Sequence, residues 1–314
     1  MPVPETVSNY TGSVSEVTLG PQSGSGPTVT VGGAANTACA GTESERGRRP
    51  VIAMDVLDTA PDDWPDALKS CFSSVIEKPA EWARQCVEEY GADLICIKYD
   101  GSHPDRGDLS VSSAVEITKE ILDSAGVPLV LWGCGNDEKD NKLLPEVSQA
   151  CKGQNCLIGT VTEDNYKAVT AIALADGHNL ITEAPLDINI GKQINILVSD
   201  MGFPQDRIVT YQNTGALGYG LEYTYSIQER QRLAALSGDK MLAMPVICDI
   251  GYESWRSKEA KTEDAPEWGD IADRGPMWEA ATAVALIQSG ADILRMRHPR
   301  AVRAVKEYIN DIWS

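Results

Sequence analysis

The sequence predicts an α/β fold in which eight parallel strands alternate with helices and close into a (β/α)8 TIM barrel. A repeated phrase is the first observation: Gly91-Ala92-Asp93 and Gly290-Ala291-Asp292 each precede a short apolar run. Glycine suits the left-handed residue that ends a helix, and an apolar run without polar alternation is typical of a strand buried on both faces. Buried strands separated by helices indicate βαβ units and a parallel sheet.

The number of strand-and-helix units is the second observation. Eight units follow Pro50, and eight is the number at which a parallel sheet can close into a barrel. The expected strands are Val51–Val56, Leu94–Lys98, Pro128–Trp132, Cys156–Thr160, Asn179–Thr182, Arg207–Tyr211, Pro245–Asp249 and Asp292–Arg295. The expected helices are Pro79–Tyr90, Ser112–Ser124, Leu143–Cys151, Glu163–Ala175, Asp187–Asp200, Ser226–Leu236, Met277–Ser289 and Arg300–Ile312. An open doubly wound sheet is the alternative, which the lack of a dinucleotide-type glycine fingerprint after the first strand disfavours.

The unequal lengths of the loops are the third observation. Loops that lead into strands are mostly short, such as Gly126-Val127 and Gly177-His178. Loops that leave strands are long, and they span residues 57–78, 99–111, 133–142, 212–225 and 250–276. In a barrel of this kind the loops after the strands share one face, and that face carries function. We therefore expect the functional site at the carboxyl ends of the strands.

The first fifty residues differ from the rest, because they are rich in Gly, Ser, Thr and Val and poor in helix formers. Val14–Leu19 and Thr28–Val31 are expected to form two short strands joined by the loose turn Gly20–Pro27. We expect this hairpin to plug one end of the barrel. The predicted organisation is an N-terminal extension with a β-hairpin over residues 1–50 and a TIM barrel over residues 51–314.

The charge balance limits the partners that the chain can bind. The net charge is −19, from 46 acidic and 27 basic residues. Nucleic acids and anionic membranes are polyanions, so we expect neither as a partner. No apolar stretch approaches the roughly 20 residues that span a bilayer, and Met1–Glu5 lacks the basic start of a secretory signal. We therefore expect a cytoplasmic protein.

The eight cysteines agree with that compartment. Most of them lie inside expected strands or helices, as reduced buried thiols do. Nowhere are two cysteines separated by two residues, and none lies near the three histidines in the sequence. The sequence therefore contains no iron–sulfur or zinc motif.

Polar side chains stand at or near the expected strand ends. They are Asp55, Asp100, Asn136, Thr160, Glu183, Asn213, Asp249 and His298. Asp55 and Asp249 could act as general acid and base, although capping helices and orienting loops are the more frequent roles. His298 precedes Pro299 and opens a helix, which favours a structural role. Lys98 ends a strand, where a Schiff-base lysine could lie, but no partner residue identifies it as one.

Three loops add weaker signals. Asn213–Gly220 is glycine-rich, so its backbone amides can approach a ligand closely, and Gly133-Cys134-Gly135 before Asn136 is a shorter version. Glycine in loops is more often simple turn chemistry. The loop 250–276 holds Tyr252, Trp255 and Trp268 among charges, and it is interpreted as a lid, a partner surface or a loop pinned by its aromatic residues.

Six phrases of the sequence carry a family resemblance. They are Ser15–Gly20, Thr28–Gly33, Arg49–Asp58, Asp93–Asp100, Trp132–Asn136 and Tyr211–Gly215. On these residues the chain resembles the small subunit of the corrinoid iron–sulfur protein and its archaeal counterpart, the delta subunit of the acetyl-CoA decarbonylase/synthase complex. The resemblance covers essentially the whole chain, including the expected hairpin.

The resemblance implies a TIM barrel paired with a large subunit that carries the [4Fe–4S] cluster and most of the cobalamin-binding domain. It places the corrinoid over the carboxyl-terminal face of this barrel, between the subunits. The cobalt would take a methyl group from a methyltetrahydrofolate-dependent methyltransferase and deliver it to acetyl-CoA synthase/CO dehydrogenase. A reductive activator would restore oxidised Co(II). The chain would then be a methyl-carrier subunit of the reductive acetyl-CoA (Wood–Ljungdahl) pathway of carbon fixation, without turnover of its own.

In such a protein the cofactor performs the chemistry and the polypeptide holds it. The expected cofactor-binding residues, placed by their positions at strand ends, are Asn136, Thr160, Asn213, Gly215, Asp55, Asp100, Asp249 and His298. No catalytic residue and no metal ligand is expected on this chain. The rival interpretation is an autonomous pterin-dependent methyltransferase with the same fold, in which Asp55, Asn136 and Asp100 would bind the pterin and assist proton transfer. A third is a scaffold whose loops serve protein contacts alone.

Overall fold

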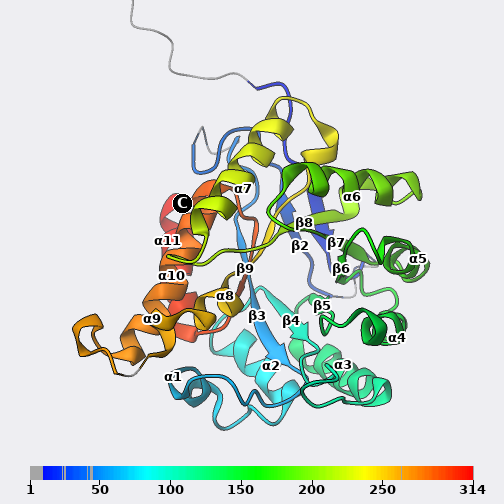
Figure 1. Cartoon of the computed structure of the whole chain (residues 1–314). Helices are drawn as coiled ribbons and strands as arrows, with labels where there is room; N and C mark the ends of the chain where they lie inside the picture. The colour runs from blue at the N-terminus through cyan, green and yellow to red at the C-terminus, as the bar shows by residue number, and fades with distance from the viewer. Residues whose placement is uncertain are drawn as a thin grey trace, which may run out of the picture.

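A computed structural model describes residues 10–22, 24, 26–40, 42, 45–262 and 264–313, so the expected features of Met1–Glu5 lie outside the described residues. Eight parallel strands form a single sheet in the order β8-β7-β6-β5-β4-β3-β10-β9, surrounded by helices (Figure 1). The strands are β3 (Val51–Leu57), β4 (Leu94–Lys98), β5 (Leu129–Trp132), β6 (Leu157–Val161), β7 (Asn179–Ala184), β8 (Ile208–Gln212), β9 (Ile247–Asp249) and β10 (Ile293–Met296). A parallel bridge between Thr210 and Val246 joins β8 to β9, with 2.8 Å from Thr210 N to Pro245 O. The predicted TIM barrel is confirmed.

The strands bury both of their faces, which explains their continuous apolar sequence. Along β3, Val51 and Ala53 point into the barrel, whereas Ile52 and Met54 pack against the surrounding helices. The other strands alternate in the same way, because side chains of a strand point to opposite faces in turn. The barrel interior is therefore filled by apolar residues near its amino-terminal end.

The repeated Gly-Ala-Asp phrase performs the same task twice. Gly290 has a φ of 113° after its helix, a conformation that glycine adopts without steric cost. The carboxylate of Asp292 accepts the backbone N–H of Val246 at 2.8 Å, and Asp93 accepts that of Ile52 at 2.9 Å. Each aspartate thus ties the start of its own strand to the neighbouring strand.

The main helices are α2 (Pro79–Glu88), α3 (Val111–Ala125), α4 (Asp137–Ala150), α5 (Tyr166–Asp176), α6 (Ile188–Asp200), α7 (Leu221–Leu236), α10 (Ile271–Ser289) and α11 (Pro299–Ile312). Shorter helices are α1 (Asp66–Lys69), α8 (Ile250–Arg256) and α9 (Lys258–Lys261), so the loop 250–276 is partly helical. None of the described helices is both long and apolar enough to cross a membrane.

Three helices begin five or six residues earlier than the sequence pattern predicts, and one of them is α7, which begins at Leu221 instead of Ser226. Helix α4 begins at Asp137 instead of Leu143, because the side chain of Asn136 accepts the N–H of Lys139 at 3.0 Å. Helix α10 begins at Ile271 and continues through Pro276, which cannot donate to the carbonyl of Ala272. Arg300 donates to that carbonyl instead, at 3.0 Å, so the helix tolerates the proline.

The N-terminal hairpin is present and closes the amino-terminal end of the barrel. Strands β1 (Glu16–Leu19) and β2 (Val29–Gly32) pair antiparallel. Val17, Leu19 and Val31 are fully buried and belong to the apolar cluster inside the barrel. The carbonyl of Thr18 accepts the side-chain amides of Asn155 at 2.8 Å and Asn179 at 3.1 Å. The division into an extension and a barrel at residue 50 stays a prediction.

Candidate functional site

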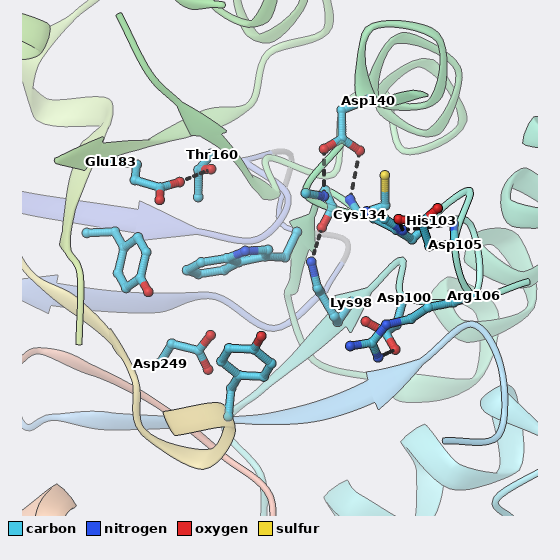
Figure 2. Close-up of a pocket in the computed structure, with 15 residues that line it drawn as sticks. Lys98, Asp100, His103, Asp105, Arg106, Cys134, Asp140, Thr160, Glu183 and Asp249 are labelled. Atoms are coloured by element: carbon cyan, nitrogen blue, oxygen red, sulfur yellow. Dashed lines mark hydrogen bonds and ion pairs between the residues drawn. The ribbon is translucent and has the colours of Figure 1, made fainter. Parts of the chain in front are cut away.

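A pocket of about 580 Å³ opens at the carboxyl-terminal mouth of the barrel. We call it the mouth pocket. It is lined by Lys98, Asp100, His103, Asp105, Arg106, Trp132, Gly133, Cys134, Gly135, Asp140, Thr160, Glu183, Tyr211, Asp249 and Tyr252. Figure 2 shows Glu183 next to Thr160, with Asp249 apart from both, and Lys98 near Asp100. The pocket lies at the carboxyl ends of the strands, where the long loops led us to expect the functional site.

The floor of the pocket follows from strand alternation. Ala53, Cys96 and Ile247 point into the barrel, so the residues two positions further along each strand point inward as well. These residues form a second inward-facing layer nearer the mouth. Its members are Asp55, Lys98, Trp132, Glu183, Tyr211, Asp249 and Arg295. The barrel interior is therefore apolar below and polar at the mouth.

Arg295 lies at the centre of this layer and is 1% exposed. It donates to Asp55 at 2.5 and 3.1 Å and to Asp249 at 2.8 Å. Its guanidinium carbon lies 4.4 Å from the centroid of the Trp132 ring, and Trp132 meets Tyr211 edge-on at 5.0 Å. The buried charges are paired and hydrogen-bonded, because a charge that is buried without a partner is strongly destabilising.

The pKa values of Asp55 and Asp249 are shifted in opposite directions. Burial opposes ionisation of Asp55, but Arg295 and Arg297 outweigh it and hold the pKa of Asp55 below its ordinary value. Arg297 donates to Asp55 at 2.8 Å. Burial raises the pKa of Asp249, and Arg295 compensates only in part. One oxygen of Asp249, Oδ1, is buried without a hydrogen-bond partner among the described residues.

Two further groups on the pocket wall have shifted pKa values. Burial lowers the pKa of Lys98, whose ammonium donates to the carbonyl of Gly133 at 2.5 Å. Burial raises the pKa of Glu183, which accepts a hydrogen bond from the hydroxyl of Thr160. The pocket therefore offers both hydrogen-bond donors and acceptors in a partly dehydrated environment.

Two side chains fix the loops that frame the pocket. Asp140 accepts the N–H groups of Cys134 at 2.7 Å and Gly135 at 2.9 Å. A Cβ atom on Gly133 would lie 2.6 Å from Asp140 Oδ2, so this turn requires glycine. Asp58 accepts the N–H groups of Gly101 at 2.6 Å and Ser102 at 3.0 Å. The loop after β4 also carries an ion pair between Asp100 and Arg106.

The structure brings three of the expected cofactor-binding residues to the mouth pocket, namely Asp100, Thr160 and Asp249. Asp55 lies beneath the pocket and is engaged by two arginines. Asn136 caps α4.

Asn213 and Gly215 lie in the β8–α7 loop, where both bond Thr224. The carbonyl of Asn213 accepts its hydroxyl at 3.1 Å, and the N–H of Gly215 donates to it at 2.7 Å. Neither residue lines the mouth pocket.

His298 lies outside the mouth pocket and caps α11. Its Nδ1 accepts the N–H of Arg300 at 3.0 Å, and its ring stacks on Trp255 with centroids 5.7 Å apart. Burial lowers the pKa of His298 to about 4, so the imidazole is neutral at physiological pH.

Glu279 accepts the backbone N–H groups of Arg297 at 2.6 Å and His298 at 3.1 Å, and burial raises the pKa of Glu279 to about 7.

Sequence reasoning missed Arg295, Trp132, Tyr211 and Tyr252 as site residues. For the first three the signal was present, because each is two residues after an apolar position on the same face of its strand. Tyr252 lies in α8, and only the folding of the loop after β9 brings it to the pocket. The described residues contain no group of three or more His, Cys, Asp or Glu side chains that could hold a metal ion.

Comparisons with known proteins decide the family. The family model for the CO dehydrogenase/acetyl-CoA synthase delta subunit matches residues 16–305. The chain belongs to this family. Relatives named acetyl-CoA decarbonylase/synthase complex subunit delta are 36% identical in Methanopyrus kandleri and 36% in Methanothermobacter thermautotrophicus. The matches cover 84% and 96% of this chain and 66% and 76% of those relatives, so the chain spans about two thirds to three quarters of their length.

Solved structures with a similar backbone support the fold of this delta-family chain. Dihydropteroate synthase from Yersinia pestis superposes with a TM-score of 0.57 at 15% identity, over 84% of this chain and 93% of that one. The Coxiella burnetii enzyme in complex with pteroic acid gives a TM-score of 0.56 at 12% identity, over 95% and 99%. At such identities the likeness concerns the barrel fold alone.

Proposed function

We propose that this chain is the small subunit of a heterodimeric corrinoid iron–sulfur protein, and that its mouth pocket covers one face of a corrinoid. The large subunit would hold the corrinoid and the [4Fe–4S] cluster. The bound cobalt would accept a methyl group from a methyltetrahydrofolate methyltransferase and pass it to acetyl-CoA synthase/CO dehydrogenase, with a reductive activator as a further partner. Membership of the delta-subunit family is the observation that carries the proposal.

The size of the mouth pocket fits a covering role. Its volume of about 580 Å³ falls within the range of sites that enclose a drug-sized ligand. A corrin ring with its side chains is larger than such a ligand, so this pocket would receive one part of it. The rest of the cofactor would need a second protein, which agrees with a two-subunit carrier.

The donor set of the pocket also fits the rim of a corrin, whose side chains end in primary carboxamides. A carboxamide both donates and accepts hydrogen bonds. Lys98 has donor capacity left after its bond to Gly133, and the lining residues Glu183 and Asp249 carry carboxylate acceptors. We propose Lys98, Thr160, Glu183 and Asp249 as contacts, with Asp100 at the rim.

The ionisable side chains beneath and beside the mouth pocket are held by hydrogen bonds within the chain, which argues against acid–base catalysis by this chain. Asp55 is held by Arg295 and Arg297, and Glu279 is held by three N–H donors. His298 is neutral and caps a helix. Their role would be to keep the floor rigid while the residues above it exclude water from the cofactor.

An ultraviolet–visible titration tests the proposal. We expect the complex of this chain with the large subunit to shift the absorption bands of bound methylcobalamin, and the isolated large subunit to lack the shift. Thr160→Val should reduce the shift, whereas Leu174→Ala, an exposed change on α5, should leave it intact. An unchanged spectrum on adding this chain would refute the covering role.

The rival interpretation has its own decisive result. If the isolated chain transfers the methyl group of methyltetrahydrofolate to added free cob(I)alamin without a large subunit, it is an autonomous methyltransferase.

A further inference from the structure

A second hollow lies outside the mouth pocket, between the β8–α7 loop and the amino-terminal half of α10. Its volume is about 450 Å³, and its apolar lining consists of Leu217, Trp268, Met277, Trp278 and Ala281. We call it the Trp268 groove. Helices α9 and α10 lie on the left of Figure 1, away from α5 on the right.

Large apolar side chains are exposed in and around this groove. Trp268 is 44% exposed and Met277 is 67% exposed, and Tyr219 in the β8–α7 loop and Tyr223 in the first turn of α7 are 45% and 62% exposed. The other large hydrophobic residues exposed in the described parts of the chain are Leu174, Leu186 and Leu233. Scattered exposed residues need no explanation, but a contiguous apolar patch marks an interaction site.

Both walls of the Trp268 groove are held in place by the chain itself. Arg274 donates at 2.9 Å to the carbonyl of Gly269, bonds the carbonyls of Glu259 and Thr262, and lies 5.6 Å from the centroid of Trp268. On the other wall, Leu217 donates its N–H to the hydroxyl of Thr282 at 3.2 Å. An aromatic side chain in a fixed position loses little entropy on binding, so it suits the centre of an interface.

One residue that lines the groove has a hydrogen-bond donor without a partner in the part of the chain that the structure describes. The indole N–H of Trp278 is buried and has no acceptor among the described residues. Buried indole groups normally find a partner. This N–H has almost no exposed surface, so an occupant of the groove would reach it only after the side chains around it move.

Charge selects between a second copy of this chain and a different protein. Asp270 lies at the edge of the groove and Glu267 is next to Trp268, both on the exposed surface, whereas Asp273 at the same edge is paired with Arg300 at 2.7 Å. A symmetric contact between two copies would place the same patch on itself, with like charges together. The net charge of −19 adds to this repulsion. A partner with an apolar centre and a basic rim is favoured.

We propose that the Trp268 groove docks the large subunit, through an apolar side chain flanked by basic residues. This inference rests on the proposed function. Its geometric support is position. Asp249 of the mouth pocket precedes α8, which contains Tyr252, and α9 follows α8. The N–H of Lys258 in α9 donates to the hydroxyl of Tyr219 in the β8–α7 loop at 3.3 Å. A subunit seated over the mouth would therefore reach the groove along the same rim.

Affinity measurements with the purified large subunit test the groove. Met277→Lys places an ammonium in the groove at a position that is two-thirds exposed, so the fold should be retained. We expect this variant and Trp268→Ala to raise the Kd for the large subunit roughly tenfold or more. Glu267→Lys should weaken binding less and reduce its salt dependence. Leu174→Ala is the matched control and should bind like the unchanged chain.

Each outcome has a distinct meaning. If the unchanged chain does not bind the large subunit, the proposed function fails. If it binds and the Met277 and Trp268 variants bind within twofold of it, with unaltered thermal unfolding, the groove is not the docking site. If sedimentation shows that the unchanged chain dimerises and Met277→Lys abolishes the dimer, the occupant is a second copy and the inference is overturned.

Discussion

Arg295 donates two hydrogen bonds to Asp55 at the bottom of the barrel mouth, at 2.5 and 3.1 Å, and both residues are almost completely buried. The two residues come from neighbouring strands, β10 and β3, which pair in register around Ala53 and Arg295. The same guanidinium reaches Asp249 on β9, so one cation links three adjacent strands. The pair therefore stabilises the barrel where the mouth pocket begins.

We predict that Arg295→Met destabilises the protein by about 3–5 kcal/mol, because it leaves buried carboxylates without their main partner. Asp249 has no other ion-pair partner among the described residues, whereas Asp55 keeps Arg297. Urea unfolding followed by circular dichroism measures the change. Arg303→Met, on the exposed face of α11, is the control and should change stability by less than about 0.5 kcal/mol.

Glu279 should make stability depend on pH. Burial raises the pKa of Glu279 to about 7 from the ordinary 4.5, so the folded protein binds this proton more tightly than the unfolded chain. The stabilising contribution is complete below about pH 4.5 and is lost as the pH rises through about 7.

Glu279→Gln removes this titration. The difference in unfolding free energy between the variant and the unchanged protein should vary by up to roughly 3 kcal/mol between pH 4.5 and 8. Parallel stability curves for the two proteins over that range would contradict the assignment.

Asp58→Asn should loosen the loop after β4. The carboxylate accepts the N–H groups of Gly101 and Ser102 and the hydroxyl of Ser102 at 2.7 Å, and an amide cannot accept all three as well. We expect amide hydrogen exchange at Gly101 and Ser102 to accelerate roughly tenfold. Asp62→Asn is exposed near the same loop and should leave those rates unchanged.

His298 should prove structural. His298→Ala removes the cap of α11 and the stack on Trp255, and should cost about 1–2 kcal/mol. His298→Asn retains a cap acceptor and should recover part of that stability. Neither variant should alter the corrinoid spectrum of the two-subunit complex, because His298 does not line the mouth pocket. A spectral change without loss of stability would assign His298 to the cofactor site.

Helix boundaries show where local sequence patterns stop being sufficient. Met277–Ser289 satisfies the helical pattern, but α10 begins six residues earlier, at Ile271. The proline at position 276 argues against that extension locally. It is tolerated because Arg300, which follows β10, satisfies the carbonyl of Ala272. No local pattern contains a contact between residues 28 positions apart.

The candidate site divides in the same way. Asp100, Thr160 and Asp249 could be selected from the sequence, because polar residues at the ends of parallel strands share one face. Asn136 and His298 satisfied the same rule, yet the side chain of each turned to cap the helix that follows. A residue that follows a strand can also precede a helix. The sequence does not show whether its side chain will line the pocket or cap that helix.

The class of the fold follows from the amino-acid sequence alone. Eight apolar runs separated by helices can bury both faces of every strand only in a parallel sheet covered by helices, and the Gly-Ala-Asp phrases mark two of the strand starts. Which charges meet at the mouth depends on how the strands are brought together in three dimensions. Arg295 lies 240 residues from Asp55 in the chain, and closure of the barrel brings the two together in a site from which water is excluded, where an unpaired charge would be too costly to keep.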